Sequence, residues 1–559
     1  LDESAPRALL VLAPAGVGKS RLRREFLRRV ATRGERMRVL MGRGDLMGTS
    51  TPFGLLQQAL LQLCEVQPND GPAERQAKLR QHLGQRLPAA EREHTVAFLG
   101  ELCGVPFPDA GNSALRVARQ QPPVMEEGIR QAFLTWLRLE CAGQPVMLVL
   151  EDLHWSDAAT VQLIDVALHQ LVESPLLVLA LSRPEGPELF PKLWPTTAQP
   201  VFLRPLSRRA SEQLVRQVLG KHTPDDVATR IIDQSAGHAL YLEELIRAIA
   251  EGKGEELPKT VLAMLQGRIG RLESGARRVL RAASVFGEHC WAGGVAGLLG
   301  LERAEALRWM QLLVQQELLE ERHDSRFSNE TEYRFRHALM RDAAYSLLSD
   351  EDRLLGHRLA AGFLKAAGES AAVLAYHHQA AGDHEEAMHA FMHAGHGALQ
   401  LSQHSEARRH YAAASESLGH LPDTPDNRRV QVDILLSRVQ VGLTNEPNEQ
   451  LLQQLAQARA LLDSLAGTEG ASAEDRQRLA YVAYFIGRVH HYSGRSDEAI
   501  AHFEQAMPVI SQLGEAELLV TPTSAIARAL VGQGAFGRGG KLLADIIEPL
   551  AELGDLGEL

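Results

Sequence analysis

Short apolar runs alternate with amphipathic stretches over the first two hundred residues of the chain. The first run, Ala8–Leu12, is followed by a Gly-bearing turn and then by Ser20–Leu27, whose apolar residues share one helical face. Four later apolar runs of strand length are Met37–Met41, Pro145–Leu150, Leu176–Leu181 and Gln199–Leu203. Apolar runs of this length are typical of strands buried in a parallel sheet when helical stretches separate them. The pattern therefore predicts an α/β domain with a parallel five-stranded sheet and a helical insertion between residues 52 and 139.

From about residue 207 the pattern is helical almost throughout, and Ser207 is the expected N-cap of the first of these helices. Three predicted helices, 261–272, 275–284 and 302–321, precede an alternating segment at 327–335, an order that suggests a winged helix. Beyond residue 338, small residues stand four positions before aromatic ones in the pairs Ala387/Phe391, Ala407/Tyr411 and Ala499/Phe503. This spacing indicates a TPR-like α-solenoid. The expected domains are a P-loop ATPase core at 1–206, a helical lid at 207–256, a winged helix at 257–350 and TPR-like repeats at 351–559.

The turn after the first strand carries the clearest chemistry. It reads Ala-Pro-Ala-Gly-Val-Gly-Lys-Ser from Ala13 to Ser20, between a strand and a helix, which is the setting of a phosphate-binding P-loop. Its backbone N–H groups and the positive end of the helix would surround a phosphate. Lys19 would reach the β- and γ-phosphates, and the Ser20 hydroxyl would bind Mg²⁺. Ala13 stands where the usual pattern has a further glycine.

Polar residues end two of the later strands. Glu151 and Asp152 follow the run Pro145–Leu150, as expected at the carboxyl edge of a parallel sheet, where ligands bind. One acid would hold Mg²⁺ and the other would polarise the attacking water; we assign these roles to Glu151 and Asp152 in that order, and the reverse assignment stays open. Arg183 follows the next strand, where it would either sense the γ-phosphate or pair with a surface acid.

Composition narrows the class of protein. The 559 residues carry a net charge of −11, which argues against general coating of nucleic acid. The four cysteines are scattered without metal-ligand spacing, and there is neither a membrane-length apolar run nor a signal-peptide pattern, which together predict a cytoplasmic protein. The chain starts almost on its first strand and stops within a helical pattern, so we expect a fragment of a longer protein. Six histidines on later helices are interpreted as surface residues rather than metal ligands: His377, His378, His384, His389, His393 and His396.

Five ordered motifs, spread from about Ala8 to Tyr345, resemble one family. They are the P-loop at 13–20, Leu-Glu-Asp-Leu-His-Trp-Ser-Asp at 150–157, Ser-Arg-Pro-Glu at 182–185, Gly-His-Ala-Leu-Tyr-Leu-Glu-Glu-Leu at 237–245, and Phe-Arg-His-Ala-Leu-Met-Arg-Asp-Ala at 335–343. In this order they are similar to those of the AAA-type ATPases of the STAND class, the signal-transduction ATPases with numerous domains. The resemblance is strongest to the bacterial branch joined to Ser/Thr protein kinases, adenylate cyclases or LuxR-type regulators.

The resemblance implies roles for individual residues. Glu151 and Asp152 would be the Walker B pair, Arg183 the sensor arginine, and His337 the histidine that touches the β-phosphate of bound ADP in the family. Two positions depart from the family pattern, because Ala239 replaces a proline and Ala338 replaces an acid. The implied nucleotide-binding residues are Ala15, Gly16, Val17, Gly18, Lys19, Ser20, Arg21 and His337, the implied Mg²⁺ ligands are Ser20, Glu151 and Asp152, and the implied catalytic residues are Lys19, Glu151, Asp152 and Arg183.

The leading hypothesis is therefore a switch that binds ATP or ADP with Mg²⁺ and hydrolyses ATP slowly. It would couple a protein or small-molecule signal, bound on the TPR-like region, to an output domain outside this chain. A Ser/Thr kinase is the first candidate for that output domain. ATP-dependent self-association would fit such a switch. A second hypothesis is a DNA-binding AAA/winged-helix ATPase or LuxR-type regulator. The predicted helix 302–321 argues against DNA, because it carries Arg303 and Arg308 against five glutamates. A third is a scaffold with a vestigial P-loop, and the intact Lys19, Ser20, Glu151 and Asp152 argue against it.

Overall fold

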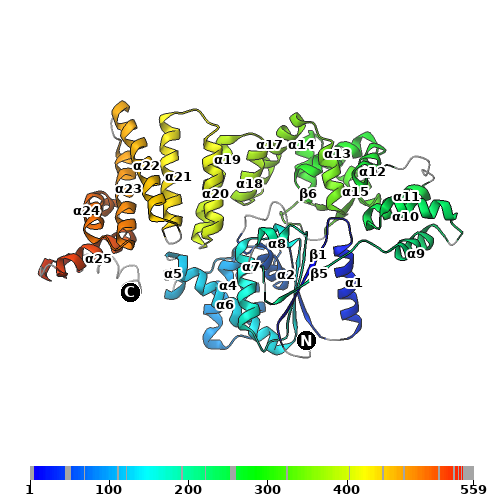
Figure 1. Cartoon of the computed structure of the whole chain (residues 1–559), viewed down its shortest axis with the longest axis horizontal. Helices are drawn as coiled ribbons and strands as arrows, with labels where there is room; N and C mark the ends of the chain where they lie inside the picture. Colours follow the sequence, from blue (N-terminus) through cyan, green and yellow to red (C-terminus); the bar gives the residue numbers. More distant parts are fainter. Residues whose placement is uncertain are drawn as a thin grey trace. The chain divides into compact units, whose positions relative to one another are not determined.

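The computed structural model describes residues 5–544 except 35, 45–51, 68–69, 110–111, 121, 191–192, 195, 221, 252–257, 259, 323–324, 402, 444–445, 470–471, 514–515, 533–535, 539 and 543. The chain divides into two compact units (Figure 1). The first comprises residues 1–107 and 129–382, and the second comprises residues 108–128 and 383–559. The expected boundary at 256–257 and the last fifteen residues of the expected repeat domain lie outside the described residues.

The first unit begins with a five-stranded parallel sheet, as the apolar runs predict. Its strands are β1 (Arg7–Leu12), β2 (Arg38–Arg43), β3 (Val146–Glu151), β4 (Leu176–Ser182) and β5 (Ala198–Phe202), in the order β2-β3-β4-β1-β5. All six residues of β3 are buried, which fits a central strand covered on both faces. The order places β4 between the strand that leads to the P-loop and the strand that ends in the two acids. The polar ends of β1, β3 and β4 therefore meet at one edge of the sheet.

Helices lie on both faces of this sheet, with α1 on one side and α2 and α7 on the other (Figure 1). Asp157 is the N-cap of α7, since its carboxylate accepts from the backbone N–H of Thr160 at 2.8 Å. The helical insertion between β2 and β3 is present as five helices. The helices of this part of the chain are α1 (Lys19–Thr32), α2 (Gly54–Leu63), α3 (Pro72–Leu83), α4 (Ala89–Leu102), α5 (Ser113–Gln120), α6 (Pro122–Gly143), the 3-10 turn η1 (Leu153–Trp155), α7 (Ala158–Gln170) and α8 (Gly186–Leu189).

Three helices follow the sheet: α9 (Arg208–Leu219), α10 (Asp225–Ser235) and α11 (Ala239–Ala250). They share an apolar core that includes Val215, Ile231, Leu242 and Leu245, and each of these side chains is fully buried. Ser207 caps α9 by accepting from the backbone N–H of Ala210, as expected. These helices correspond to the segment predicted as a lid.

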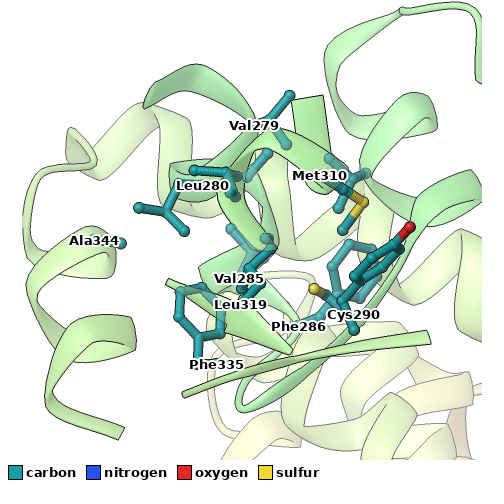
Figure 2. Packing of buried hydrophobic residues seen from close by; sticks show 14 of the residues in the cluster. Val279, Leu280, Val285, Phe286, Cys290, Met310, Leu319, Phe335 and Ala344 are labelled. Atoms are coloured by element: carbon teal, nitrogen blue, oxygen red, sulfur yellow. The ribbon is translucent and has the colours of Figure 1, made fainter. Parts of the chain in front are cut away.

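The next segment combines helices with a small antiparallel sheet of order β6-β8-β7. Its core holds Val279, Phe286, Cys290, Met310 and Phe335 among other buried side chains (Figure 2). Its elements in chain order are α12 (Val261–Gly270), α13 (Ser274–Val285), β6 (His289–Trp291), α14 (Ala292–Leu299), α15 (Arg303–Gln315), β7 (Leu319–Glu321), β8 (Glu332–Phe335), α16 (Ala338–Ser346), α17 (Asp350–Ala366) and α18 (Ala371–Ala380).

Two expectations for this segment were wrong. The helix expected at 302–321 ends at Gln315, because Glu317 adopts a left-handed backbone with φ 58° and the chain continues as β7. Glu317, Glu320 and Glu321 therefore do not lie on the helix, and the charge argument against DNA that counted them no longer holds. The helix α14, with two glycines in its first turn, was not predicted at all.

His377 also contradicts its interpretation as a surface residue. It is fully buried, and its Nδ1 lies 2.9 Å from Nδ1 of His357, which in turn bonds to the hydroxyl of Tyr345 through Nε2 at 2.9 Å. Both imidazoles are part of the packing between α17 and α18.

The second unit contains seven long helices that pack as neighbouring pairs: α19 (His384–Gln400), α20 (His404–Leu418), α21 (Pro425–Gly442), α22 (Asn448–Glu469), α23 (Ala473–Tyr492), α24 (Ser496–Leu513) and α25 (Ala516–Gly532). In the pair α19–α20, a Cβ added to Gly395 would lie 2.5 Å from the ring of Tyr411. In the pair α23–α24, a Cβ on Gly487 would lie 2.6 Å from the ring of Phe503. The two pairs thus repeat one packing device at the same sixteen-residue spacing, which is the regularity of a TPR-like solenoid.

Among the described residues, no helix combines the length and the apolar character that crossing a bilayer requires.

Candidate functional site

The P-loop runs from the end of β1 into α1 and depends on two glycines. Gly16 has φ 78° and Gly18 has φ 117°, a backbone conformation that side chains with a Cβ rarely adopt. A Cβ at Gly18 would find no atom within 4 Å, so the loop is open to a ligand at this point. Gly18 is also the N-cap residue of α1 and has no side chain to satisfy the N–H groups of the first turn. No side chain caps the first turn of α1, so the N–H groups at this helix start suit a phosphate.

Lys19 is folded back onto this loop. Its Nζ donates to the carbonyl oxygens of Ala13 at 2.6 Å and Pro14 at 3.0 Å. Burial lowers the pKa of Lys19, and the nearby carboxylates of Asp152, Glu185 and Glu151 oppose that shift, while Arg183 adds to it. The strand order places the end of β4 beside the start of the P-loop, where the N–H of Ala13 donates to the carbonyl of Ser182 at 3.2 Å.

The two acids after β3 are each paired with an arginine. Arg23 Nε of α1 lies 3.1 Å from Glu151 Oε1, an ion pair rather than an aligned hydrogen bond, because that N–H has no hydrogen-bond acceptor. Arg43 Nε at the end of β2 donates to Asp152 Oδ2 at 3.1 Å. Asp152 itself has φ 52° and ψ 44°, a left-handed conformation that turns the chain from β3 into η1.

The end of β4 brings Ser182 and Arg183 to the same edge. The backbone N–H of Arg183 points at Nδ1 of His154 at 3.4 Å, and its guanidinium lies 5.9 Å from the ring centre of Trp155. Burial lowers the pKa of His154 to about 4, so this imidazole is neutral near pH 7. The hydroxyl of Ser182 and Nε2 of His154 are buried without a hydrogen-bond partner in the part of the chain that the structure describes. Two unpartnered polar atoms at this edge are consistent with a ligand that would satisfy them.

Two later segments contact the P-loop directly. His238, at the start of α11, holds the carbonyl of Ala15 through Nε2 at 3.0 Å, and the N–H of Leu240 donates to the carbonyl of Gly16 at 3.0 Å. A Cβ at Gly16 would lie 2.5 Å from the His238 ring and 3.2 Å from Leu339 of α16. The P-loop therefore touches both the lid helices and the segment 261–346.

His337, the residue expected at the β-phosphate, is the N-cap residue of α16. Burial lowers the pKa of His337; Glu243 and Glu320 raise it, and Arg336 and Arg268 lower it further. In these two segments, His238, Leu240 and Leu339 lie against the P-loop.

The donor set suits Mg²⁺ in its chemistry. A hydroxyl at Ser20 and carboxylates at Glu151 and Asp152 are the oxygen ligands that this ion prefers. The described residues contain no cluster of three or more His, Cys, Asp or Glu side chains that would hold a metal ion without further ligands.

Sequence reasoning missed three residues of this site: Arg23, Arg43 and His238. The first two stand at the expected edge of the sheet, and the position of Arg43 at the end of a parallel strand was a usable signal. It was overlooked because the second strand was expected to end at Met41, whereas β2 continues to Arg43. His238 is 223 residues from Ala15, and no local pattern reveals such a contact.

Comparison with known proteins identifies the first part of the chain. Residues 1–179 match the family described as the AAA ATPase domain. The matched residues contain the P-loop, both acids and the strands β1 to β3, whereas Ser182 and Arg183 lie beyond the match.

Two further similarities concern most of the chain. Over 479 residues it is 27% identical to an uncharacterized protein of Rhizobium meliloti (strain 1021), an alignment that covers 80% of this chain and 44% of that protein. The chain thus spans less than half the length of the curated relative that it matches. Among solved structures it is similar to a signal transduction ATPase with numerous domains, a protein with a tetratricopeptide repeat sensor from Pyrococcus horikoshii. That similarity has 12% identity and a TM-score of 0.35, and it covers 99% of this chain and 82% of the other.

Proposed function

We propose that this chain is the nucleotide-operated part of a signalling ATPase of the STAND class. The observation that carries the proposal is the P-loop itself, which lies opposite Glu151 and Asp152 and is also contacted by His238 of the lid helices and Leu339 of α16. A nucleotide in this loop would meet groups from three successive segments. Nucleotides with two and with three phosphates would therefore stabilise different arrangements of those segments.

The proposed roles follow from the placement of each side chain. Lys19 exchanges its two carbonyl acceptors for phosphate oxygens, and Ser20 and Glu151 orient the Mg²⁺·ATP complex. Asp152 accepts a proton from the water that attacks the γ-phosphorus, and Arg183, at the end of the neighbouring strand, faces the γ-phosphate. When bound, Mg²⁺ would neutralise part of the negative charge of the phosphates. Hydrolysis is slow in this account, because both acids are engaged by arginines in the arrangement described here.

The later segments carry the switch and the input. The order α13, β6, α14, α15, β7, β8 is that of a winged helix, and we assign 257–350 to that domain, after the core at 1–206 and the lid at 207–256. The repeats from residue 351 onward would bind a protein or small-molecule signal. The output, a kinase or another effector, belongs to a longer parent protein in the cytoplasm.

Two variants test this proposal, and a third variant is the control. Lys19→Ala removes a charge-assisted contact, so ATP affinity falls by at least about tenfold. Asp152→Ala keeps ATP binding and lowers turnover by about 10²-fold or more. Lys78→Ala, a lysine of α3 that pairs with Asp70 at 2.6 Å, is the control and leaves both quantities unchanged. Fluorescent-ATP titration and phosphate release measure them, and wild-type turnover in Lys19→Ala would refute the proposal.

A further inference from the structure

Arg43 stands between two carboxylates that come from distant parts of the chain. Its Nε donates to Asp152 Oδ2 at 3.1 Å, and its Nη2 lies 2.8 Å from Glu288 Oε2. Asp152 follows β3 in the AAA domain, whereas Glu288 lies between α13 and β6, in the segment proposed as a winged helix. The three side chains are 22%, 21% and 16% exposed in the order Arg43, Asp152, Glu288. One guanidinium therefore joins an acid of the ATPase site to the segment that follows the lid.

The backbone around Arg43 is held tightly on both sides. A Cβ at Gly42 would lie 2.2 Å from the carbonyl oxygen of Leu55, and a Cβ at Gly44 would lie 2.5 Å from that of Asp152. Gly44 also donates its N–H to the carbonyl of Glu151 at 2.8 Å. These contacts fix where the Arg43 side chain starts. Its guanidinium then reaches the two carboxylates through different N–H groups of one planar fork. A lysine ammonium has no such fixed planar geometry.

The charges around Arg43 depend on each other. Burial alone would lower the pKa of Arg43, but Glu288, Asp152 and Glu151 outweigh it, and the pKa is raised. Removing one carboxylate from a partly buried group of this kind leaves the remaining charges unbalanced. If Glu288 moves away, the guanidinium is compensated mainly by the acidic pair, and it then competes more strongly with any other cation for Asp152.

We propose that Arg43 is a positioning residue for Asp152, and that Glu288 controls how strongly Arg43 holds it. Docking of the segment that carries Glu288 draws part of the arginine charge away, so more of the negative charge of Asp152 acts on the nearby Mg²⁺·ATP complex, whose Mg²⁺ Ser20 and Glu151 would hold. Undocking has the reverse effect, so the position of the segment and the state of the acidic pair are linked. This inference rests on the proposed function for the role of Asp152.

The test uses two variants that remove opposite charges, Arg43→Gln and Glu288→Gln. In Arg43→Gln the competing cation is gone, so the Mg²⁺ concentration for half-maximal binding of a fluorescent ATP analogue falls about fivefold. Turnover in the same variant falls about tenfold with an unchanged KM, because Asp152 loses the partner that orients it. In Glu288→Gln the half-saturating Mg²⁺ concentration rises about threefold. ATP affinity in EDTA stays the same in both.

Glu330→Gln is the matched control. Glu330 is 15% exposed, lies in the same segment as Glu288, and pairs with Arg303 rather than with the ATPase site. We expect it to leave the Mg²⁺ dependence at the wild-type value even if its stability falls. The double variant Arg43→Gln/Glu288→Gln should behave as Arg43→Gln alone, because the proposed effect of Glu288 on Asp152 passes through Arg43.

Shifts of the same sign in the two single variants, or additive effects in the double variant, would overturn the inference. So would a Mg²⁺ dependence that Arg43→Gln leaves unchanged while wild-type protein binds ATP normally. A wild-type chain that binds no ATP in EDTA or in Mg²⁺ would overturn the proposed function together with this inference, and the two failures are thus distinguished.

Discussion

At the scale of single residues, the P-loop is held in shape by groups that a nucleotide would displace or join. Lys19 donates to two carbonyls of its own loop, and His238 holds the carbonyl of Ala15 from the far side. The Nδ1 atom of His238 accepts from the N–H of Tyr241 at 3.3 Å, so Nε2 carries the proton and is the donor to Ala15. The helices that follow the sheet are thus tied to the loop through the side chain of His238.

The buried histidines His357 and His377 predict that the stability of the protein depends on pH. Burial lowers the pKa of His357 to about 4, with a smaller contribution from Arg341, and burial places that of His377 well below its ordinary value. In the folded state both rings have a lowered pKa, whereas in the unfolded chain their pKa is near 6.5. Between pH 6.5 and 4 the unfolded state therefore binds more protons, and the free energy of unfolding falls as the pH falls.

The variant His357→Gln should reduce this dependence by about 1 kcal/mol between pH 7.5 and 5. Urea denaturation midpoints at the two pH values measure it, and His222→Gln, at an exposed position, is the control. Equal pH dependence in the wild type and in His357→Gln would contradict this account of the pair.

Several site residues were predictable because their signals are local. Lys19 follows a strand and a Gly-bearing turn, and Glu151, Asp152 and Arg183 follow apolar runs, so their common edge results from parallel strand order. The partners of these residues were not predictable in the same way. Arg43 meets Asp152 across 109 positions; its place at the end of a parallel strand would have indicated the shared edge, but the sequence does not show which acid it pairs with.

At the scale of elements, the solenoid shows how one glycine admits one aromatic ring. Gly395 of α19 and Gly397, two positions later, are both helical, but only the first faces a ring. A Cβ at 395 would lie 2.5 Å from Tyr411, whereas at 397 it would find no atom within 4 Å. Gly395→Ala should lower the free energy of unfolding by about 1–3 kcal/mol through overpacking.

Gly397→Ala should raise the free energy of unfolding by about 0.5–1 kcal/mol, because alanine has the higher helix propensity and meets no obstacle. Urea denaturation of the two variants measures the difference. Changes of the same sign at both positions would contradict the packing described for α19 and α20.

Element prediction succeeded where burial made a segment uniformly apolar and failed where the backbone departed from a regular pattern. The five strands of the parallel sheet were all predicted: burial makes β3 and β4 uniformly apolar, whereas β5 is mostly exposed and was predicted from its short apolar run alone. The helix expected at 302–321 was too long because charged residues on both sides of Glu317 continue its pattern, while the left-handed conformation at that position ends it. The helix α14 was not predicted because the two glycines in its first turn have low helix propensity. Tertiary packing stabilises this helix, since Gly294 lies against Phe286 and Phe363.

At the scale of the whole molecule, the account requires nucleotide to change an equilibrium between arrangements of the segments. Shifting such an equilibrium from 1:99 to 99:1 needs about a 10⁴-fold difference in affinity. A ligand that touches only the P-loop would supply little of this difference. The contacts that His238, Leu339 and the Arg43–Glu288 pair make with the ATPase site give three separate sources for it.

The measurement that tests this central claim most directly is nucleotide content and solution size, determined together on wild-type protein and on Lys19→Ala. Each protein would be examined without nucleotide, with ADP and with ATP and Mg²⁺, by quantifying bound nucleotide and by size-exclusion chromatography with light scattering. We predict that the wild type binds both nucleotides and that ATP changes its hydrodynamic size or assembly, whereas Lys19→Ala stays the same in all three conditions. Wild-type protein that holds nucleotide yet has the same size with ADP, with ATP and without nucleotide would contradict the account.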